Sequence, residues 1–311
     1  MTEPDTRRTL LRTLADADSP LSGPTLAGRL GVSRAAVWKH VEALREAGFV
    51  IESDDGYVVR SVPDYGAAAI EFGLDAPYAV EYHDRLPSTN DRARELAADG
   101  ESGRVVVAGE QTGGRGRLDR PWSSPPGGVY ASVLLRPDRP PAHVPLFTLA
   151  AAVAVTRACR EASVDAVIKW PNDVLLAGSE RKLAGILTEM EGEADRVSWL
   201  VVGVGANVDV AAEALPETAT SVRAAGGTAD RRRFCQRVIE TVHDLRDDPE
   251  AVLPTWRDYA VTLGRDVRVE TPGGVVEGEA VDVRHPGALV VRTDAGERVV
   301  HAGDCEHLRP A

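Results

Sequence analysis

Residues 111–122 read QTGGRGRLDRPW, a loop sequence that follows the apolar run VVVAGE and contains three glycines and three arginines. Glycines let a backbone approach an anion closely and turn its N–H groups toward it. Arginine adds donors in a fixed fork that suits phosphate or carboxylate. Arg115, Arg117 and Arg120 therefore indicate an anion-binding loop. The alternative is a mobile, solvated loop, which often has the same composition.

This loop does not fit two familiar nucleotide-binding motifs. It lacks the GK[ST] sequence that ends a P-loop. It does not open a helix after GxGxxG either, because the following sequence, LDRPWSSPPGG, contains prolines that exclude one. A nucleotide that binds here must therefore be held by a different scheme.

Around the loop, residues 78–262 alternate strand-like and helix-like segments, which indicates an α+β domain with a mixed sheet. We expect strands over RVVVAGE (104–110), GGVYASVLL (127–135), AVIKW (166–170), LAGILTEM (183–190) and SWLVVGVGANV (198–208). We expect helices over TNDRARELAAD (89–99), PLFTLAAAVAVTRACREA (145–162) and RRRFCQRVIETVHDL (231–245).

Residues 1–62 have the pattern of a winged helix. Apolar residues recur at helical spacing in TRRTLLRTLADA (6–17), SGPTLAGRLGVS (22–33) and RAAVWKHVEALREAGF (34–49). The run FVIESDDGYVV (49–59) then predicts two short strands around a turn. Helix, glycine-containing turn and helix form the helix-turn-helix layout, and the hairpin suits the wing.

The third helix of this segment is the candidate DNA-reading element. A recognition helix reaches base edges with its exposed polar side chains. Ser33, Arg34, Lys39 and His40 are the residues that we expect on or near that face. The segment is close to neutral in charge, so its charge does not by itself indicate DNA binding. The alternative is an ordinary solvated helix in a domain that only dimerises or is vestigial.

Two further segments complete the organisation of the chain. Residues 63–77 are rich in Pro, Gly and Ala and predict a linker. Residues 263–311 contain short valine runs separated by PGG, PG and AGE turns, which are typical of a small antiparallel barrel.

The composition limits the class of protein. The net charge is −12, which weakens any expectation of broad nucleic-acid binding. Three widely spaced cysteines predict neither a disulfide framework nor a metal site, and they suit a reducing cytoplasm. The N-terminus does not resemble a secretory signal, and we expect no membrane span.

Other polar residues cluster at strand ends. IKWPNDVLL places Lys169, Asn172 and Asp173 together, where they could hold phosphate, metal or an amine, although PND is also a good turn former. RKLAGIL begins a strand with Lys182 and leaves space at Gly185. The alternative for Lys182 is simple exposure at a strand start.

Two further segments offer contacts to a ligand. GVGANV ends an apolar strand near Asn207, where a simple turn is the alternative. PSTN supplies Ser88, Thr89 and Asn90 at a helix start, where they can cap the helix and also face a polar ligand.

Each of these signals is moderate, but their order is specific. STN, QTGGRGR, KWPND, RKLAGIL and GVGAN occur in series before a small β-domain, and this series resembles the biotin protein ligases over nearly the whole chain. The segment SRAAVWKHVEALREAGF resembles the subgroup in which the ligase is also the biotin operon repressor. The resemblance implies an N-terminal winged helix-turn-helix, a central mixed-sheet domain like a class II synthetase, and a C-terminal SH3-like barrel.

The resemblance also implies an activity. Members of this family join biotin to ATP, giving biotinyl-5′-AMP and pyrophosphate, and then transfer biotin to a lysine of a carboxylase carrier domain. The carboxylate and the triphosphate repel each other, so fixed cations and Mg²⁺ are needed where they meet. The cations that we expect there are Arg115, Arg117, Arg120, Lys169 and Lys182. No covalent enzyme intermediate is expected, because no cysteine falls in a motif.

Roles follow from the motif match. The expected catalytic residues are Arg117, Lys182 and Asp173. The expected biotin contacts are Ser88, Thr89, Asn90, Gln111, Gly114, Arg115, Gly116, Arg117, Lys182 and Gly185. The expected contacts to ATP or the adenylate are Arg117, Arg120, Trp122, Lys169, Asn172 and Asn207. Asp173 is also the candidate magnesium ligand and the candidate base for the acceptor lysine.

The expected partners are a biotin carboxyl carrier domain, operator DNA and a second copy of the chain. Closure of the loop on biotinyl-AMP is expected to favour that dimer. One departure concerns the loop: bacterial members often have RRGR where this chain has Arg117-Leu118-Asp119-Arg120. We therefore expect a stiffer loop or weaker retention of the adenylate.

Three rival functions remain open. The chain could be a ligase whose helix-turn-helix represses nothing. It could be a regulator that senses a small anion without catalysis, although such a sensor would not need every one of these cations. It could also be a lipoate or other acyl ligase, since the residues do not prove which acid is the substrate.

Overall fold

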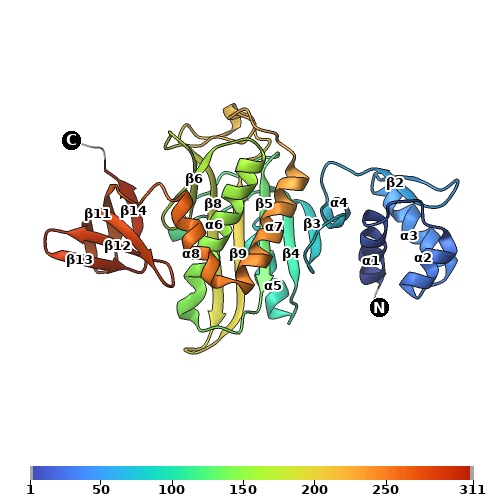
Figure 1. Cartoon of the computed structure of the whole chain (residues 1–311), viewed down its shortest axis with the longest axis horizontal. Coiled ribbons are helices and arrows are strands. Elements are labelled where there is room, and N and C mark those ends of the chain that lie inside the picture. The colour runs from blue at the N-terminus through green and yellow to red at the C-terminus, as the bar shows by residue number, and fades with distance from the viewer. Residues whose placement is uncertain (1–2, 309–311) are drawn as a thin grey trace.

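The computed structural model of the chain describes residues 3–308, with side chains from residue 6 onward. The molecule is elongated, and its N-terminal helices, central sheet and C-terminal strands follow one another along the long axis (Figure 1). The α+β architecture predicted from the sequence is confirmed.

The N-terminal part is a three-helix unit with a hairpin, as predicted. Its elements are α1 (Glu3–Ala15), α2 (Gly23–Leu30), α3 (Arg34–Glu46), β1 (Val50–Glu52) and β2 (Val58–Ser61). The side chains of Ser22 and Ser33 cap α2 and α3 by accepting backbone N–H groups. Gly31 ends α2 in the left-handed conformation, with φ of 66°, which a residue without Cβ adopts readily.

The segment predicted as a linker is ordered and packs on both of its neighbours. It contains α4 (Ala67–Glu71). The ring of Phe72 meets that of Phe49 edge-on at 5.9 Å in the N-terminal core. Ile70, fully buried, belongs instead to the central core. This short segment therefore joins the two hydrophobic cores.

The central part is built on a seven-stranded sheet with the order β3-β4-β5-β9-β8-β7-β6. The strands are β3 (Ala79–Leu86), β4 (Arg104–Gln111), β5 (Val129–Leu135), β6 (Ala166–Lys169), β7 (Asp173–Leu176), β8 (Lys182–Gly192) and β9 (Val197–Ala206). β3 and β4 are parallel and the other neighbours are antiparallel. The mixed sheet is as predicted, but β3 and β7 were not.

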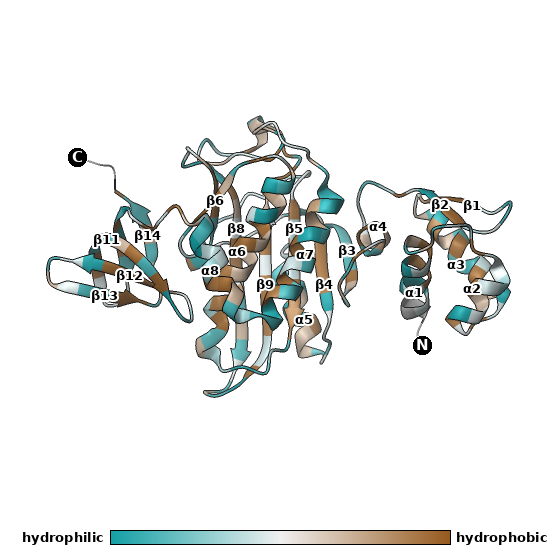
Figure 2. Cartoon of the chain, in the orientation of Figure 1, coloured by the Kyte–Doolittle hydropathy of each residue, from teal (hydrophilic) through white to brown (hydrophobic). Residues whose placement is uncertain are grey.

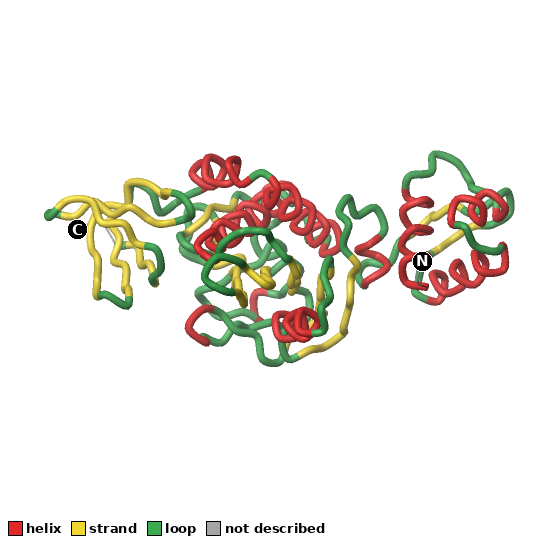
Figure 3. Tube along the Cα trace, turned by 90° about the horizontal axis from the view of Figure 1, so that it is seen from below, coloured by secondary structure: helices red, strands yellow, loops and turns green. Residues whose placement is uncertain are grey.

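Helices cover the two sheet faces unequally (Figures 1 and 3). One face carries α6 (Val144–Glu161), α7 (Arg231–Asp247) and α8 (Pro249–Tyr259), and the other carries α5 (Thr89–Ala98). Along β9, Val202 and Val204 join the core under α6, while Val201 joins the smaller cluster under α5. Alternate residues of a strand thus reach opposite faces.

Helix α6 is the central core helix. Residues 141–161 are long and apolar enough to cross a membrane by length and composition, but 67% of an apolar 18-residue window within them is buried inside the protein. Figure 2 shows its apolar colouring continued by the strands behind it. The sequence predicted this helix, whereas α8, which follows α7 after a single residue, was not predicted.

The C-terminal part is a five-stranded antiparallel sheet, as the valine runs predicted. Its strands are β10 (Asp266–Thr271), β11 (Gly274–Arg284), β12 (Ala288–Thr293), β13 (Gly296–Val300) and β14 (Asp304–His307), in the order β13-β12-β11-β10-β14. The indole of Trp170, which is 2% exposed, donates to the Gly287 carbonyl at 2.9 Å. A buried central residue thereby fixes this sheet beside the central domain.

Replacement of Leu149 on α6 tests this account of the core. Leu149→Ala is expected to lower the free energy of unfolding by about 2–5 kcal/mol, because Leu149 is 1% exposed and its loss leaves a cavity. Urea denaturation followed by circular dichroism measures the change. Val275→Ala is the control, since Val275 is 49% exposed. Equal effects of the two replacements would contradict the assignment of α6 to the core.

Candidate functional site

A cavity of about 280 Å³ opens on the sheet face that carries α5. Gly185 of β8 and Gly205 of β9 are paired across the two strands and line it, as does Gly203. These positions lie on the face opposite to Val202 and Val204. Because glycines stand where side chains would otherwise project, the sheet is hollow at this place.

The floor of the cavity is a closed network of small polar side chains. The Gln111 carbonyl oxygen accepts from the backbone N–H of Thr89 at 2.8 Å and from its hydroxyl at 3.1 Å. The Asn90 amide donates to the Leu187 carbonyl, and its oxygen accepts from Ser132. Thr89 and Asn90 are about 95% buried, so their positions are set before any ligand arrives.

Trp122 forms one wall of the cavity and depends on the glycines behind it. A Cβ at position 205 would lie 2.6 Å from the indole nitrogen, so the ring can rest there only against glycine. The Lys182 ammonium stands 5.0 Å from the ring centroid. The indole N–H is buried without a hydrogen-bond partner among the described residues, which suits a donor that awaits a ligand.

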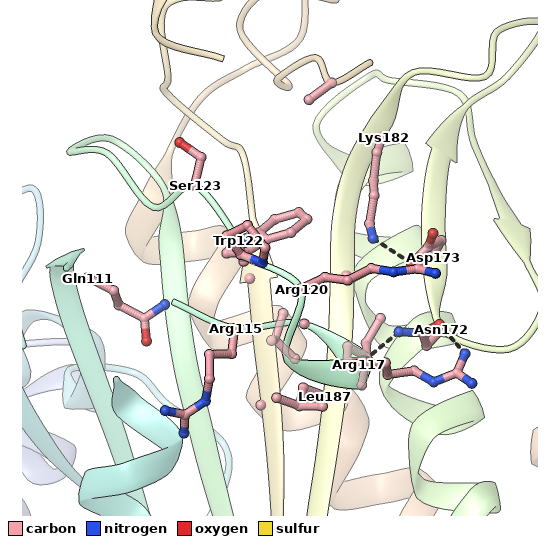
Figure 4. Close-up of a pocket in the computed structure, with 18 of the residues that line it drawn as sticks. Gln111, Arg115, Arg117, Arg120, Trp122, Ser123, Asn172, Asp173, Lys182 and Leu187 are labelled. Carbon is pink, nitrogen blue, oxygen red and sulfur yellow. Dashed lines mark hydrogen bonds and ion pairs between the residues drawn. The ribbon is translucent and has the colours of Figure 1, made fainter. Parts of the chain in front are cut away.

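Positive side chains from two separate segments, the loop with Arg117 and Arg120 and the start of β8 with Lys182, converge beside Trp122 (Figure 4). The Lys182 ammonium lies 2.6 Å from the Asp173 carboxylate. Arg117 donates to the Asn172 side-chain oxygen at 3.2 Å. Arg120 pairs with the Asp304 carboxylate at 2.5 Å.

Burial shapes the electrostatics of this group. Desolvation lowers the pKa of the Arg117 guanidinium, and the nearby Asp304 and Asp173 carboxylates partly offset that effect. The hydrogen bond that Arg120 donates to the Asp304 carboxylate raises the pKa of Arg120. Both guanidinium groups nonetheless remain charged at neutral pH. The cavity therefore offers fixed cations to an anion.

Arg115 lines the cavity but is turned toward α5. Its guanidinium pairs with Asp91 at 2.6 Å, and in Figure 4 it points away from Lys182 and Arg117. The hydrogen bond to Asp91 raises its pKa. Arg115 thus anchors the start of the loop to the helix that carries Thr89 and Asn90.

Most of the predicted site residues meet in this cavity. Those that line it are Ser88, Thr89, Asn90, Gln111, Arg115, Gly116, Arg117, Arg120, Trp122, Asn172, Asp173, Lys182, Gly185 and Asn207. The hydroxyl of Ser88 also caps α5, as the alternative interpretation predicted. Residues from five distant segments of sequence are therefore neighbours in the fold.

Two predicted contacts are not among the lining residues. The charge of Lys169 acts instead on Cys305 and His307, so it faces β14 of the C-terminal sheet. Lys169 is the last residue of β6, and the indole of its neighbour Trp170 donates to the Gly287 carbonyl, so Lys169 stands where the C-terminal sheet docks on the central domain. Gly114 is packed against another part of its own loop, since a Cβ at this position would lie 2.6 Å from the Trp122 carbonyl oxygen.

One wall of the cavity was not predicted from the sequence. That wall includes Leu215, Pro216, Thr218 and Ala219, which follow a single 3₁₀ turn, η3 (Ala212–Ala214). The Lys182 backbone N–H donates to the Thr218 carbonyl at 2.9 Å, which fixes this wall against β8. Nothing in the run LPETA identifies it as part of a site, because its role arises only from pairing with β8.

The C-terminal domain supplies another residue that was missed. Asp304 begins β14 and lines the same cavity. An acidic residue 131 positions after Asp173 carries no motif, so only the docking of the C-terminal sheet reveals it. The side-chain oxygen of Asn207, which lines the cavity, is buried and has no hydrogen-bond partner among the described residues, so it can accept from a ligand.

The carboxylates present limit how a metal could bind. Among residues 3–308, no group of three His, Cys, Asp or Glu side chains could hold a metal ion. Magnesium is often held by one or two carboxylates together with substrate phosphates. Asp173 and Asp304 fit that mode and do not form a closed metal site by themselves.

The expected DNA-reading face is only partly as predicted. Arg34 and Lys39 are exposed on α3, and Ser33 caps its N-terminus. His40, by contrast, is 7% exposed, so its assignment to the exposed face was wrong. The physical reason is helical periodicity: His40 stands one turn from Val37 and Leu44, on the stripe that packs into the core. Trp38, 57% exposed, occupies the outer face instead.

Three families match successive parts of the chain. Residues 6–58 match the HTH domain family, residues 82–207 the Biotin/lipoate A/B protein ligase family, and residues 262–308 the Biotin protein ligase C terminal domain. The middle match includes every predicted site residue of the central domain.

Known proteins are similar to this chain over much of its length. The Bifunctional ligase/repressor BirA of Bacillus subtilis is 37% identical over 96% of this chain and 98% of its own length. The Biotin--[acetyl-CoA-carboxylase] ligase of Mycobacterium tuberculosis is 35% identical over 71% of this chain and 86% of its own. The biotin protein ligase of Aquifex aeolicus, solved in complex with biotin and ATP, superposes with a TM-score of 0.61 at 26% identity, covering 74% of this chain and 99% of its own.

The glycines of the cavity can be tested by adding one methyl group. Gly203→Ala is expected to lower the free energy of unfolding by about 1–3 kcal/mol, because the new Cβ would overlap the buried Asn90 side chain. Thermal denaturation measures the change. Gly28→Ala is the control: its Cβ would meet nothing within 4 Å, and the longer side chain favours helix α2. If Gly203→Ala melts at the wild-type temperature, the predicted overlap of its Cβ with Asn90 is refuted.

Proposed function

We infer, because this chain belongs to the biotin protein ligases of the bifunctional ligase/repressor type, that it activates biotin with ATP and transfers it to a lysine of a protein. The observation that carries the inference is the shared cavity. Lys182 of β8 converges there with Arg117 and Arg120 of the loop, and the three cations stand beside a preformed polar floor. A pocket with several fixed cations suits a reaction between two anions.

The first step joins the two anions. One carboxylate oxygen of biotin attacks the α-phosphorus of ATP, the bond from that phosphorus to pyrophosphate breaks, and biotinyl-5′-AMP forms. Negative charge accumulates on the phosphoryl oxygens as the two groups meet. Lys182 and Arg117 stabilise that charge by exchanging their internal oxygen partners for those of the substrates.

The polar floor provides recognition of biotin. The ureido ring of biotin has both N–H donors and a carbonyl acceptor, and it needs a complementary set. Ser88, Thr89, Asn90 and Gln111 provide hydroxyl and amide groups, with Gly185 leaving room for the chain of the substrate. Since Thr89 and Asn90 are already held by hydrogen bonds, little ordering is needed on binding.

Trp122 protects the intermediate. A mixed anhydride hydrolyses if water reaches it, so the cavity must close over it. Trp122 ends the loop of residues 111–122 that carries the three arginines, which we call the arginine loop. It covers Gly205, and its apolar surface can pack there against the adenine side of the adenylate. Arg120, Asn172 and Asn207 are the other groups that we assign to the nucleotide.

The second step transfers the acyl group. The lysine amine of the acceptor attacks the carbonyl carbon of biotinyl-AMP, AMP departs with its phosphate oxygen, and one proton leaves the amine. Asp173 is the residue that we assign to orient the amine and accept that proton. Its carboxylate becomes available when Lys182 turns toward the anionic substrate.

Magnesium is proposed as the metal of the reaction. When bound with the nucleotide it neutralises charge on the phosphates. Asp173 is the carboxylate that we assign to it, with Asp304 as the other acidic side chain of the cavity. Lys169, which faces β14, is assigned no contact to ATP.

The proposed partners follow from the two ends of the chain. A biotin carboxyl carrier domain is the proposed acceptor of biotin, and the winged helix is proposed to bind operator DNA. The proposed location of both activities is the cytoplasm. A dimer is proposed for operator binding, through the edge strand β3 that pairs with loop-bearing β4. Closing of the loop on biotinyl-AMP would favour that dimer.

Incubation with biotin, MgATP and a carrier domain tests the ligase. One biotin is expected on the carrier, read by mass, with pyrophosphate released. Arg117→Ala and Lys182→Ala are each expected to slow pyrophosphate release about 10²- to 10³-fold, because each removes a fixed cation from the reacting charge. Undiminished release by either folded variant would overturn the proposed roles. Lipoate added in competition distinguishes the acyl-ligase alternative, since it should not reduce biotin transfer.

Operator binding is tested by a gel shift with DNA from upstream of the chain's own gene. Arg34→Ala is expected to weaken binding by about 1–3 kcal/mol, because Arg34 is exposed at the start of α3. Arg298→Ala, an exposed arginine on β13, is the control. Biotin and MgATP together should tighten wild-type binding. A shift that ignores both ligands would rule out biotin-responsive repression, whereas the absence of any shift would favour the monofunctional ligase.

A further inference from the structure

Two successive residues of the C-terminal domain hold the arginine loop of the central domain. The Arg117 guanidinium donates to the Gly303 carbonyl at 2.6 Å. The Arg120 guanidinium pairs with the Asp304 carboxylate at 2.5 Å. These contacts join positions more than 180 residues apart in the chain. They act on the same two arginines that we assign to the substrate anions.

The loop between the two arginines is held in an unfavourable backbone conformation. Leu118 and Asp119 have φ of 56° and 53°, the left-handed region that residues with a side chain rarely adopt. Burial does not compensate, because the Leu118 side chain is 76% exposed. Residues 116–121 thus form an arch that carries both arginines. A hydrogen bond from the Gly116 N–H to the Arg120 carbonyl, at 2.7 Å, closes its base.

The charges of the arch also oppose its compactness. Arg120 lowers the pKa of Arg117, since two guanidinium groups close together destabilise each other. An anion between or beside them relieves this repulsion. Before substrate binds, Asp304 and, more weakly, Asp173 supply that negative charge to Arg117.

We propose that Asp304 is a positioning residue of the ligase, which holds the 116–121 arch folded with Arg117 and Arg120 beside the cavity until a substrate anion replaces it. The proposal rests on the ligase function proposed above. It gives the C-terminal domain a defined part in the reaction: the first residue of β14 prepares the loop for MgATP. The loss of the carboxylate charge should leave the arch looser and the arginines less well placed.

The expected effect is modest, because the Arg120 side chain is 62% exposed and solvent screens its ion pair. Asp304→Asn keeps the size of the side chain and removes its charge. We expect about a two- to fivefold increase in KM for MgATP, with kcat changed less than twofold. Without ligands, trypsin should cut after Arg117 about two to five times faster, as mapped by fragment mass. The Arg120–Pro121 bond is not a trypsin site, so this cut reports on the arch itself.

Two companion variants sharpen the test. Glu306→Gln removes an exposed charge from the same strand and should match wild type in both measurements. Asp304→Glu restores the charge and should recover much of the wild-type KM. A simple structural role for Asp304 would instead lower thermal stability and kcat and would not respond to the glutamate variant.

Several outcomes would overturn the proposal. Asp304→Asn with unchanged cleavage and unchanged KM would do so. A lower KM would also do so, because it would mean that Asp304 competes with the nucleotide rather than preparing its site. The ligase function is judged separately: if wild-type protein forms no adenylate, the proposed function fails, whereas faster cleavage of Asp304→Asn still supports the arch contact.

Discussion

Cations that share a confined space must be neutralised, and this constraint organises the whole active region. Lys182, Arg117 and Arg120 would repel one another if they stood unpaired around a partly desolvated cavity. The fold supplies an oxygen to each: the carboxylate of Asp173, the carbonyl of Gly303 and the carboxylate of Asp304. These pairings form a charge-balanced arrangement that the anionic substrates can enter by exchange.

The sheet explains why these groups meet in one place. Alternation along β9 sends Val202 and Val204 under α6, and it leaves Gly203 and Gly205 on the opposite face. A strand that was valine on both faces would fill this space. The hollow therefore comes from a simple rule of strand geometry combined with a choice of residue. Trp122 can then lie over β9, and the loop that carries it is brought beside Lys182.

The helix-turn-helix shows where local pattern suffices and where it does not. Apolar spacing and turn residues predicted all three helices and the hairpin of residues 1–62, because each is formed by contacts close in sequence. The same spacing should have placed His40 on the inner face with Val37 and Leu44.

The remaining misses share a cause, which is long-range pairing. Strands β3 and β7 are recognised by their partners in the sheet, and the wall at residues 215–219 is defined by its pairing with β8. The connecting segment at 63–77 looked like a linker by composition, yet Ile70 is fully buried in the central core and Phe72 packs in the N-terminal one. The composition of a segment indicates its polarity, but it does not show which surfaces of the folded protein will bury it.

By itself the sequence determined which chemical groups this protein carries and in what order: the polar STN, the arginine loop, KWPND, the lysine strand and the asparagine after GVGA. Those are local properties, set by residue type and by short spacings. Only the tertiary structure decided which of them share a cavity, that Lys169 faces β14 instead, and that Asp304 reaches across from another domain. The physical reason is that hydrogen bonds and ion pairs depend on distance in space, which strand pairing and domain docking set and which sequence separation does not reveal.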